Sequence, residues 1–554
     1  MAVLQRTPAD PSNDQVENGP HTDTRETRTS LPDQVFPVNQ SDDVEETASE
    51  RIERLGRERP QCFANIWSEI AFCFSIVMSQ ILTEYNVSGV NVILPKLIEE
   101  FNIPLAATVW PASALSLAVA STLMVFGRLS DMFGGYLVYV CGFLWTTIWS
   151  LICGFSQNMF MLIFCRALQG IGLAAFLPSG VMLLATVYRP GPRKNLVFSL
   201  YGACAVIGFF GGIFFAGICG EYLKWHWYFY VDAILCAVTT VSAYFSVPSD
   251  YAGKRKQGAK MDWIGACLIV VGLVLFVFAI TDSSHAPQRW KTPYVYVCLI
   301  IGAIVLCVAI YVEGWVASYP LLPGDLFSVK YLKPVIIVLA IVYGGLGVYL
   351  LYSTLYMMRF MGASPLQVVA WSTPMAVGGM LLSSMGGLVL HLINGTILLF
   401  ISVTGFVGSS LLFALAPQGA NYWAFVFPAM VCATIGIDIT FNVINIFITT
   451  NMPRERQGIA GALLNSVQHL GVAILLGFAD VTQAETEPDV GLRRSYKAVF
   501  WYNVACTALG CIIVAFFIRI DRAKSDMTVD EKRALERAAM EASSSSGQVD
   551  QQRA

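Results

Sequence analysis

A few ionisable side chains lie inside long apolar stretches of this 554-residue sequence, where they could bind and release protons. Glu84 lies in the apolar stretch 68–94, and Asp438 lies in the stretch 422–449. A carboxylate embedded in such surroundings could exchange a proton at physiological pH. Arg166 lies in a third stretch, and a lone charge near the centre of a bilayer costs at least about 2.5 to 3.5 kcal/mol. These residues therefore predict a polar interior with a pathway through it.

Arg166 and Glu84 each have a second interpretation. Arg166 belongs to a gating or proton-linked network, or it forms a structural pair or snorkels to the membrane interface. Glu84 is a proton-binding site, or it is a static hydrogen-bonded partner of Arg166.

Other polar residues also interrupt the apolar stretches. Asp438, Asn442 and Asn445 follow one another at i, i+4 and i+7, so they form a polar stripe on one helix face. This stripe lines a cavity, or it clamps two helices through hydrogen bonds. Asp232 lines the pathway or caps the outer end of a helix pair. His469 titrates or binds substrate, or it is a satisfied interior group.

The elements that position these residues are long apolar segments, which run from Ser68 to Ile518. A helix needs about 20 apolar residues to cross a bilayer, whose interior admits only helices or closed barrels. We therefore expect an all-α polytopic membrane protein with fourteen transmembrane helices. The helices are expected near residues 68–94, 107–127, 136–154, 159–186, 196–219, 228–247, 262–281, 294–314, 334–358, 368–390, 395–416, 422–449, 459–480 and 497–519.

Composition supports this class and argues against others. Hydrophobic residues make up 55% of the chain and charged residues 13%, whereas soluble domains carry about 25% charged residues. The net charge of −3 gives no indication of a nucleic-acid partner. The fourteen cysteines form no CxxC pair, so we interpret them as packing residues and expect no metal site. Residues 1–60 are expected to be a disordered tail, and 520–554 a second polar tail with a short helix near 528–542.

Lys and Arg residues in the short loops predict the orientation. If the N-terminus is cytoplasmic, the inner loops carry more of these residues than the outer loops do. Basic residues before the first helix and after the last widen the difference. Both termini are therefore expected in the cytoplasm. The expected location is the plasma membrane, and an internal membrane such as that of the vacuole stays open.

A weak internal repeat predicts how the helices are grouped. Asn102–Leu105, after the first helix, has a similar segment Ala363–Leu366 after the ninth. Segment Gly127–Gly135 has a fainter copy at Gly387–Gly395. Either match alone could be chance similarity between apolar helices. Taken together they predict a six-helix bundle at 68–247, an inserted central helix pair at 262–314 and a second six-helix bundle at 334–519, as in transporters.

Four segments resemble motifs of the major facilitator superfamily. Gly127–Gly135 resembles its loop motif between helices 2 and 3, and Arg166–Gly172 resembles its helix 4 motif. Tyr85–Pro95 and Trp225–Asp232 resemble segments of the drug:proton antiporters with 14 spans, the fungal multidrug-resistance type. The resemblance covers residues 68–519. It implies alternating access between two bundles, with a role for Arg166 in gating or proton coupling.

The chain departs from the family pattern at several positions. Asn86 stands where the helix 1 motif has a carboxylate, and Phe209 stands where the helix 5 motif has proline. In the loop motif, Arg128 is the nearest basic group to Asp131, which we interpret as a latch that accepts hydrogen bonds from a helix N-terminus. The glycines near 211 and 212 are typical of close helix packing.

The residues and the resemblance together give a predicted set of functional residues. The expected pathway contains Glu84, Asn86, Asn91, Arg166, Gln169, Asp232, Asp438, Asn442, Asn445 and His469. The expected gate contains Gly127, Arg128, Asp131 and Gly134.

The predicted function is secondary active transport. The sequence has no GxxxxGK[ST] loop and no HExxH motif, so we expect no ATP-driven transport, no enzymatic activity and no cofactor. We expect proton-coupled export of a small organic or amphipathic compound, such as a drug, toxin or metabolite. The partners are then the substrate, protons and the lipid bilayer. The alternatives are a uniporter or importer of ammonium, a polyamine or an amino acid, and a sensor on the same fold that transports nothing.

Overall fold

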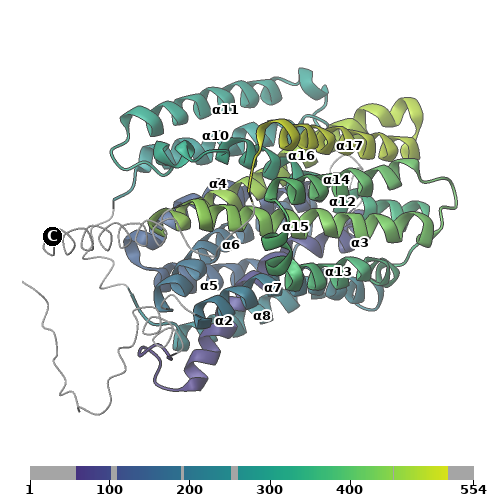
Figure 1. Cartoon of the computed structure of the whole chain (residues 1–554). Helices are drawn as coiled ribbons and strands as arrows, with labels where there is room; N and C mark the ends of the chain where they lie inside the picture. The colour runs from purple at the N-terminus through teal and green to yellow at the C-terminus, as the bar shows by residue number, and fades with distance from the viewer. Residues whose placement is uncertain (1–57, 102–108, 189–191, 251–259, 453, 522–554) are drawn as a thin grey trace, which may run out of the picture. The chain divides into compact units, whose positions relative to one another are not determined.

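The computed structural model describes residues 58–101, 109–188, 192–250, 260–452 and 454–521. Nearly all of both predicted tails, including the short helix expected near 528–542, lies outside these residues. Within the described residues, helices follow one another along the whole chain (Figure 1). Thirteen of them are long and apolar enough to cross a membrane, and α13 is a further helix where the remaining predicted span is expected.

The helices are numbered along the chain. The first group contains α2 (Ile66–Ser88) with its continuation α3 (Val90–Phe101), α4 (Trp110–Phe133), α5 (Gly135–Gly154), α6 (Met159–Val187), α7 (Pro192–Glu221) and α8 (His226–Ser246). The central pair is α10 (Trp263–Asp282) and α11 (Pro293–Tyr311). The second group contains α12 (Leu332–Phe360), α13 (Pro365–Leu392), α14 (Gly395–Leu415), α15 (Phe427–Asn451), α16 (Arg454–Val490) and α17 (Leu492–Phe517). Short 3-10 or π turns cover Arg289–Lys291, Val312–Val316, Gly324–Ser328 and Tyr422–Val426.

The last-but-one helix differs most from the prediction. The sequence predicts a helix over 459–480, whereas α16 runs from Arg454 to Val490. Its last turns are polar and therefore look like a loop in the sequence. Side chains in this part support the helix locally, because Gln483 donates a hydrogen bond of 2.6 Å to Glu487 four residues later.

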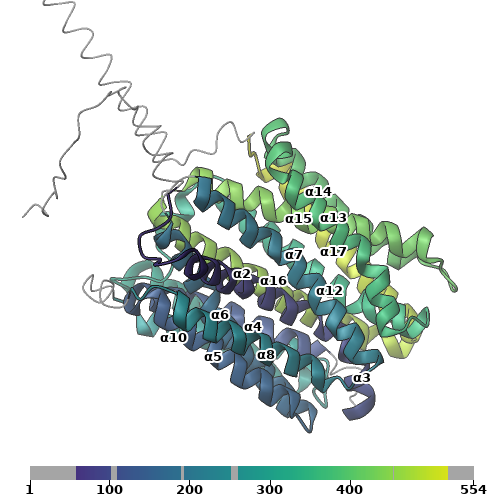
Figure 2. The same cartoon turned by 90° about the horizontal axis from the view of Figure 1, so that it is seen from below.

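The helices pack in two groups of six (Figure 2), with α10 and α11 outside them (Figure 1). In the first group α2 packs on α7 and α8, and α6 packs on α4 and α5. In the second group α12 packs on α16 and α17, and α14 packs on α15 and α17. The two groups meet where α4 contacts α16, α7 contacts α13 and α3 contacts α12. The exact limits 68–247, 262–314 and 334–519 stay a prediction.

Among the described residues, the buried apolar residues that join the two groups lie mainly on one side of the bundle. We call the side on which α2 begins and α17 ends the terminal side, and the other the opposite side. On the opposite side, a continuous buried cluster joins Leu94 and Leu97 of α3 to residues of α12 such as Leu351. A second cluster comprises buried residues of the first group, and among the described side chains of α16 Ala462 alone packs against it. The two groups are therefore closed against each other on the opposite side.

Glycines let α7 approach α2 closely, as the sequence indicates. An ideal Cβ on Gly208 would lie 2.4 Å from the backbone oxygen of Ile81, and one on Gly212 would lie 2.6 Å from that of Tyr85. No side chain larger than hydrogen fits at either position. Gly211, in contrast, has nothing within 4 Å of its ideal Cβ.

Replacing Gly212 by valine should destabilise the protein by about 1–3 kcal/mol, because two backbones would have to separate. The matched variant Gly211→Val should unfold at or above the wild-type temperature, because valine forms a helix more readily than glycine does. Thermal unfolding of both variants in detergent checks this. Equal unfolding temperatures would contradict the packing seen here.

Candidate functional site

Two carboxylates, one from each helix group, lie near each other inside the bundle. Glu84 of α2 and Asp438 of α15 are both partly buried, and their charges act on each other. Gln80, one turn earlier on α2, donates a hydrogen bond of 3.3 Å to Glu84 Oε1. Repulsion between two like charges in a partly dehydrated space is relieved when one of them binds a proton.

Residues of three further helices surround this carboxylate pair. Tyr343 of α12 lies close enough to interact electrostatically with both carboxylates, and Tyr201 of α7 lies close enough to interact with Glu84. Asp438 Oδ2 lies 3.2 Å from the ideal Cβ position of Gly379 in α13. The pair therefore lies where α2 and α7 of the first group meet α12, α13 and α15 of the second.

The polar stripe on α15 becomes more exposed toward the terminal side. Asp438 and Asn442 are partly buried, and Asn445 is exposed. The amide nitrogens of Asn442 and Asn445 donate to backbone oxygens one turn earlier, at 2.9 and 2.8 Å. His469 of α16 is also partly buried. This gradient indicates that the carboxylates are approached from the terminal side.

A small cavity lies between the two groups, closer to the opposite side. It is about large enough for one water molecule. It is lined by Ser88, Asn91, Val92, Ile213, Leu350, Ser353, Thr354, Val368, Ser372, Met375 and Met430. The buried Oδ1 of Asn91 has no hydrogen-bond partner in the described residues, so it could accept a bond from a solute or water there. The cavity walls carry both hydroxyl and apolar groups, and the space is too small for an organic compound in this state.

Arg166 lies apart from the carboxylate pair, inside the first helix group. It is 1% exposed, and its Nη1 donates to Gln169 Oε1 at 2.8 Å and to Asn86 Oδ1 at 3.2 Å. Its Nη2 donates to the backbone oxygen of Asn86 at 2.8 Å, and its Nε donates to that of Pro111 at 3.1 Å. The guanidinium thus ties α2, α4 and α6 together.

Asp232 completes the Arg166 cluster from α8. Its carboxylate accepts hydrogen bonds from Asn86 at 2.9 Å, Gln169 at 2.8 Å and Ser150 at 2.6 Å. Two side-chain amides therefore link the guanidinium to the carboxylate. The structure brings Asn86, Arg166, Gln169 and Asp232 together, while Glu84 faces the other helix group.

The predicted gating segment lies at the terminal end of α4. Arg128 contacts Asp131 at 3.7 Å, and Gly134 forms the turn to α5 with a φ of 93°. The ideal Cβ position of Gly127 lies 3.8 Å from Ala462 of α16, so this residue is at the junction of the groups. The first two backbone N–H groups of α5 donate to Asp250, at 2.9 and 3.2 Å. Asp250 is the carboxylate that caps this helix, and the sequence analysis missed it.

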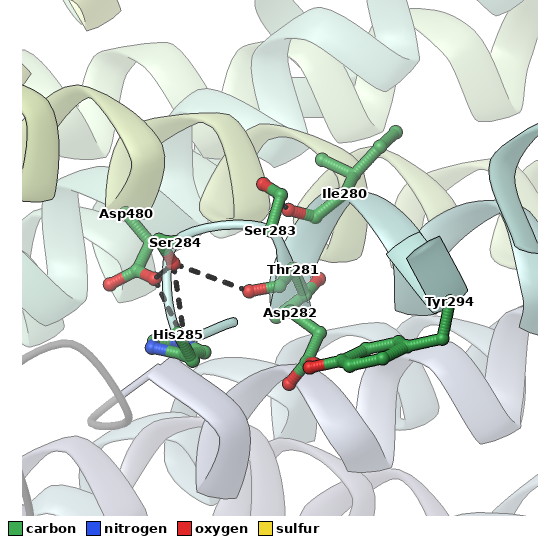
Figure 3. A network of polar contacts seen from close by, with 8 residues as sticks. All are labelled: Ile280, Thr281, Asp282, Ser283, Ser284, His285, Tyr294 and Asp480. Atoms are coloured by element: carbon green, nitrogen blue, oxygen red, sulfur yellow. Dashed lines mark hydrogen bonds and ion pairs between the residues drawn. The ribbon is translucent and has the colours of Figure 1, made fainter. Parts of the chain in front are cut away.

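A second buried polar cluster was also missed. Asp480 of α16 is fully buried and accepts hydrogen bonds from Ser284 and, at 3.1 Å, from His285 Nε2 (Figure 3). Ser284 and His285 lie in the loop 283–292 between α10 and α11. Asp480 ends an apolar stretch, which is a weak signal. Nothing in the sequence pairs it with a histidine almost two hundred residues earlier.

Comparisons with known proteins agree with this architecture. The family model described as Major Facilitator Superfamily matches residues 76–476. The chain is 33% identical to the low affinity ammonium transporter of Saccharomyces cerevisiae, over 86% of this chain and 93% of that protein. It is 31% identical to the efflux pump terJ of Aspergillus terreus, over 89% of this chain and 96% of that protein.

Solved structures show the same fold at low sequence identity. The peptide transporter POT aligns with a TM-score of 0.58 at 14% identity, over 80% of this chain and 93% of that one. The nucleoside transporter NupG aligns with a TM-score of 0.53 at 11% identity, over 80% and 98%.

Proposed function

The chain belongs to the major facilitator superfamily of membrane transporters, and we propose that it exports a small organic or amphipathic compound in exchange for protons. The observation that carries this proposal is the carboxylate pair. Glu84 and Asp438 come from different helix groups, are both partly buried and lie near each other. Relatives described as an efflux pump and as an aminotriazole resistance protein support the direction of transport.

Proton binding at this pair can drive movement because the two residues belong to different groups. When both are charged, their repulsion pushes the groups apart around the pair. A proton on either one removes that repulsion and favours closer approach. A ligand shifts a conformational equilibrium only if the two states bind it with different affinity, and a junction between moving parts provides this difference.

The other predicted residues take separate roles in this proposal. Asn442, Asn445 and His469 line the route to the pair from the terminal side. Asn91 contacts the substrate when the small cavity widens during the cycle. Arg166 with Asn86, Gln169 and Asp232 holds the first group rigid. Arg128, Asp131, Gly127 and Gly134 form the gate on the terminal side.

We propose the plasma membrane as the location, with both termini in the cytoplasm. The loops expected on the terminal side carry more Lys and Arg residues than the loops expected on the opposite side, and this difference supports the orientation. The cavity is then closed toward the outside, and the carboxylates are reached from the cytoplasm. An exporter loads its substrate in such a state.

A second candidate is transport of a small polar cation such as ammonium. The low affinity ammonium transporter of yeast favours it, as a relative at 33% identity over most of both chains. Glu84 and Asp438 would then bind the cation itself. Under this candidate, net movement would follow the gradient of the solute.

Accumulation of ethidium and of radiolabelled methylammonium in cells with and without the protein, at two external pH values, tests both candidates. Export predicts lower ethidium accumulation that depends on the pH gradient. The second candidate predicts faster methylammonium uptake with ethidium unchanged. If the protein changes neither, while the purified protein binds one of them, the sensor interpretation replaces both.

A further inference from the structure

The inserted helix pair lies on the junction between the two groups of six. α10 packs on α4 of the first group and on α16 of the second, and α11 packs on α10 (Figure 1). In the half of α10 nearer the opposite side, Val277 is buried together with Leu117 of α4 and Ala473 of α16. α10 therefore contacts both of the groups that must move relative to each other in an alternating-access cycle.

The terminal end of α10 is held by the first group through polar contacts. Arg128 of α4 donates two hydrogen bonds to the backbone oxygen of Lys260, at 3.1 and 2.8 Å. Met261 and Leu321 form a small buried cluster against Val125 of α4. We call these contacts the terminal anchor.

The opposite end of α10 is held by the second group. Ser284 and His285 both bind Oδ2 of the buried Asp480 in α16 (Figure 3). Within the described residues, the second oxygen of Asp480, Oδ1, and the second ring nitrogen of His285, Nδ1, are buried without a partner. The contact between Asp480 Oδ2 and His285 Nε2 therefore offsets much of the cost of burying these two side chains. We call the Ser284–His285–Asp480 contact the opposite anchor.

Two further features support the opposite anchor. Arg289 pairs with Glu485 in the polar extension of α16, and its φ of 52° is in the left-handed region, which is unfavourable for arginine. Gly477 lets α10 come close, because an ideal Cβ there would lie 3.0 Å from both Ile280 and Thr281. The loop is thus held to α16 at two positions, by Asp480 and by Glu485.

We propose that Asp480, His285 and Arg128 are positioning residues for the transport cycle, because they fasten the inserted pair diagonally across the two groups. α10 has twenty residues and behaves as a rod about 30 Å long. Its polar anchors are at opposite ends and in different groups. When α4 and α16 tilt against each other the distance between the anchors changes, so one of them must release. The anchored pair stabilises the state that is closed on the opposite side.

This inference rests on the alternating-access mechanism proposed above, but its test does not use transport or proton coupling. Hydrogen exchange with mass spectrometry is measured on the purified full-length protein in lipid nanodiscs. The informative peptides cover residues 90–101 of α3 and 346–357 of α12, which seal the opposite side. The variants are Asp480→Asn and Arg128→Lys. The control is Asp282→Ala, which removes the acceptor of a 2.7 Å hydrogen bond from Tyr294 between the facing ends of α10 and α11 without touching α16.

Both variants should raise exchange in the two seal peptides by about tenfold, as expected for loss of one hydrogen bond to a charged group. The control should match the wild type. The double variant should exchange no faster than the faster single variant, because releasing one end leaves nothing for the other end to hold. This non-additivity between distant residues is the signature that a local structural role would not give.

Faster exchange confined to the loop 283–292, with unchanged seal peptides, would overturn the inference. Additive effects in the double variant would overturn it as well. If Asp480→Asn fails to fold, Ser284→Ala takes its place, since it removes only the hydroxyl donor and leaves the His285–Asp480 contact in place. An unchanged seal in that variant and in Arg128→Lys would then refute the proposal.

Discussion

Glu84→Gln should reduce proton-driven substrate flux in proteoliposomes to the level of liposomes without protein. Glutamine keeps the shape of the side chain and the contact with Gln80, but it cannot bind and release a proton. The free energy of unfolding should change by only about 1 kcal/mol, because the substitution alters about one hydrogen bond. Flux of the substrate selected by the ethidium and methylammonium assay, with and without an inward proton gradient, is the measurement.

Glu99→Gln is the matched control for this substitution. Glu99 lies on α3, is exposed and pairs with Lys96 at 3.6 Å on the protein surface. Its loss should leave proton-driven flux intact. If Glu84→Gln keeps the pH dependence of the wild type, Glu84 has no part in coupling.

Asp438→Asn separates two versions of the coupling mechanism. If the two carboxylates share one proton, this variant should lose coupling as completely as Glu84→Gln does, because the repulsion that drives the groups apart is gone. If Glu84 alone carries the proton, the asparagine variant should still respond to the gradient. Comparing the two variants at matched protein orientation in the liposomes decides between them.

The positions of Glu84 and Asn86 mark how far sequence reasoning reaches. Two residues along a helix differ by about 200°, so the sequence predicts that they face different ways. Which of them faces the other helix group depends on how α2 is rotated in the bundle, and that is set by its packing on α7 through Gly208 and Gly212. The spans themselves were predictable because length and apolar composition determine them locally.

Contacts between distant segments were out of reach for the same reason. His285 and Asp480 carry no shared pattern, and α16 continues past its apolar stretch into polar turns that resemble a loop. Likewise, Asp250 caps α5 from beyond the end of α8. Helix membership follows from composition, but the pairing of polar groups follows from tertiary packing.

Arg166 should prove more important for folding than any other residue of the predicted pathway. Arg166→Met removes the donor of four hydrogen bonds. It leaves the buried Asp232 with its hydrogen bonds from Asn86, Gln169 and Ser150 but without the positive charge that the two amides link to it. Breaking a buried charge pair in this way costs about 3–5 kcal/mol. We expect little folded protein in detergent and a strongly lowered unfolding temperature, measured by size-exclusion chromatography and thermal unfolding.

Arg166→Lys distinguishes a structural role from a role in gating. Lysine keeps the positive charge, but its single ammonium group cannot reach both Pro111 and the two acceptors on Asn86, so part of the stability should be lost. Replacing Asp232 by asparagine in the Arg166→Met background should recover folded protein, because neither charge is then left alone. If Arg166→Lys instead unfolds at the wild-type temperature and transports nothing, the guanidinium acts in the cycle itself, and the rigid-group role proposed here is wrong.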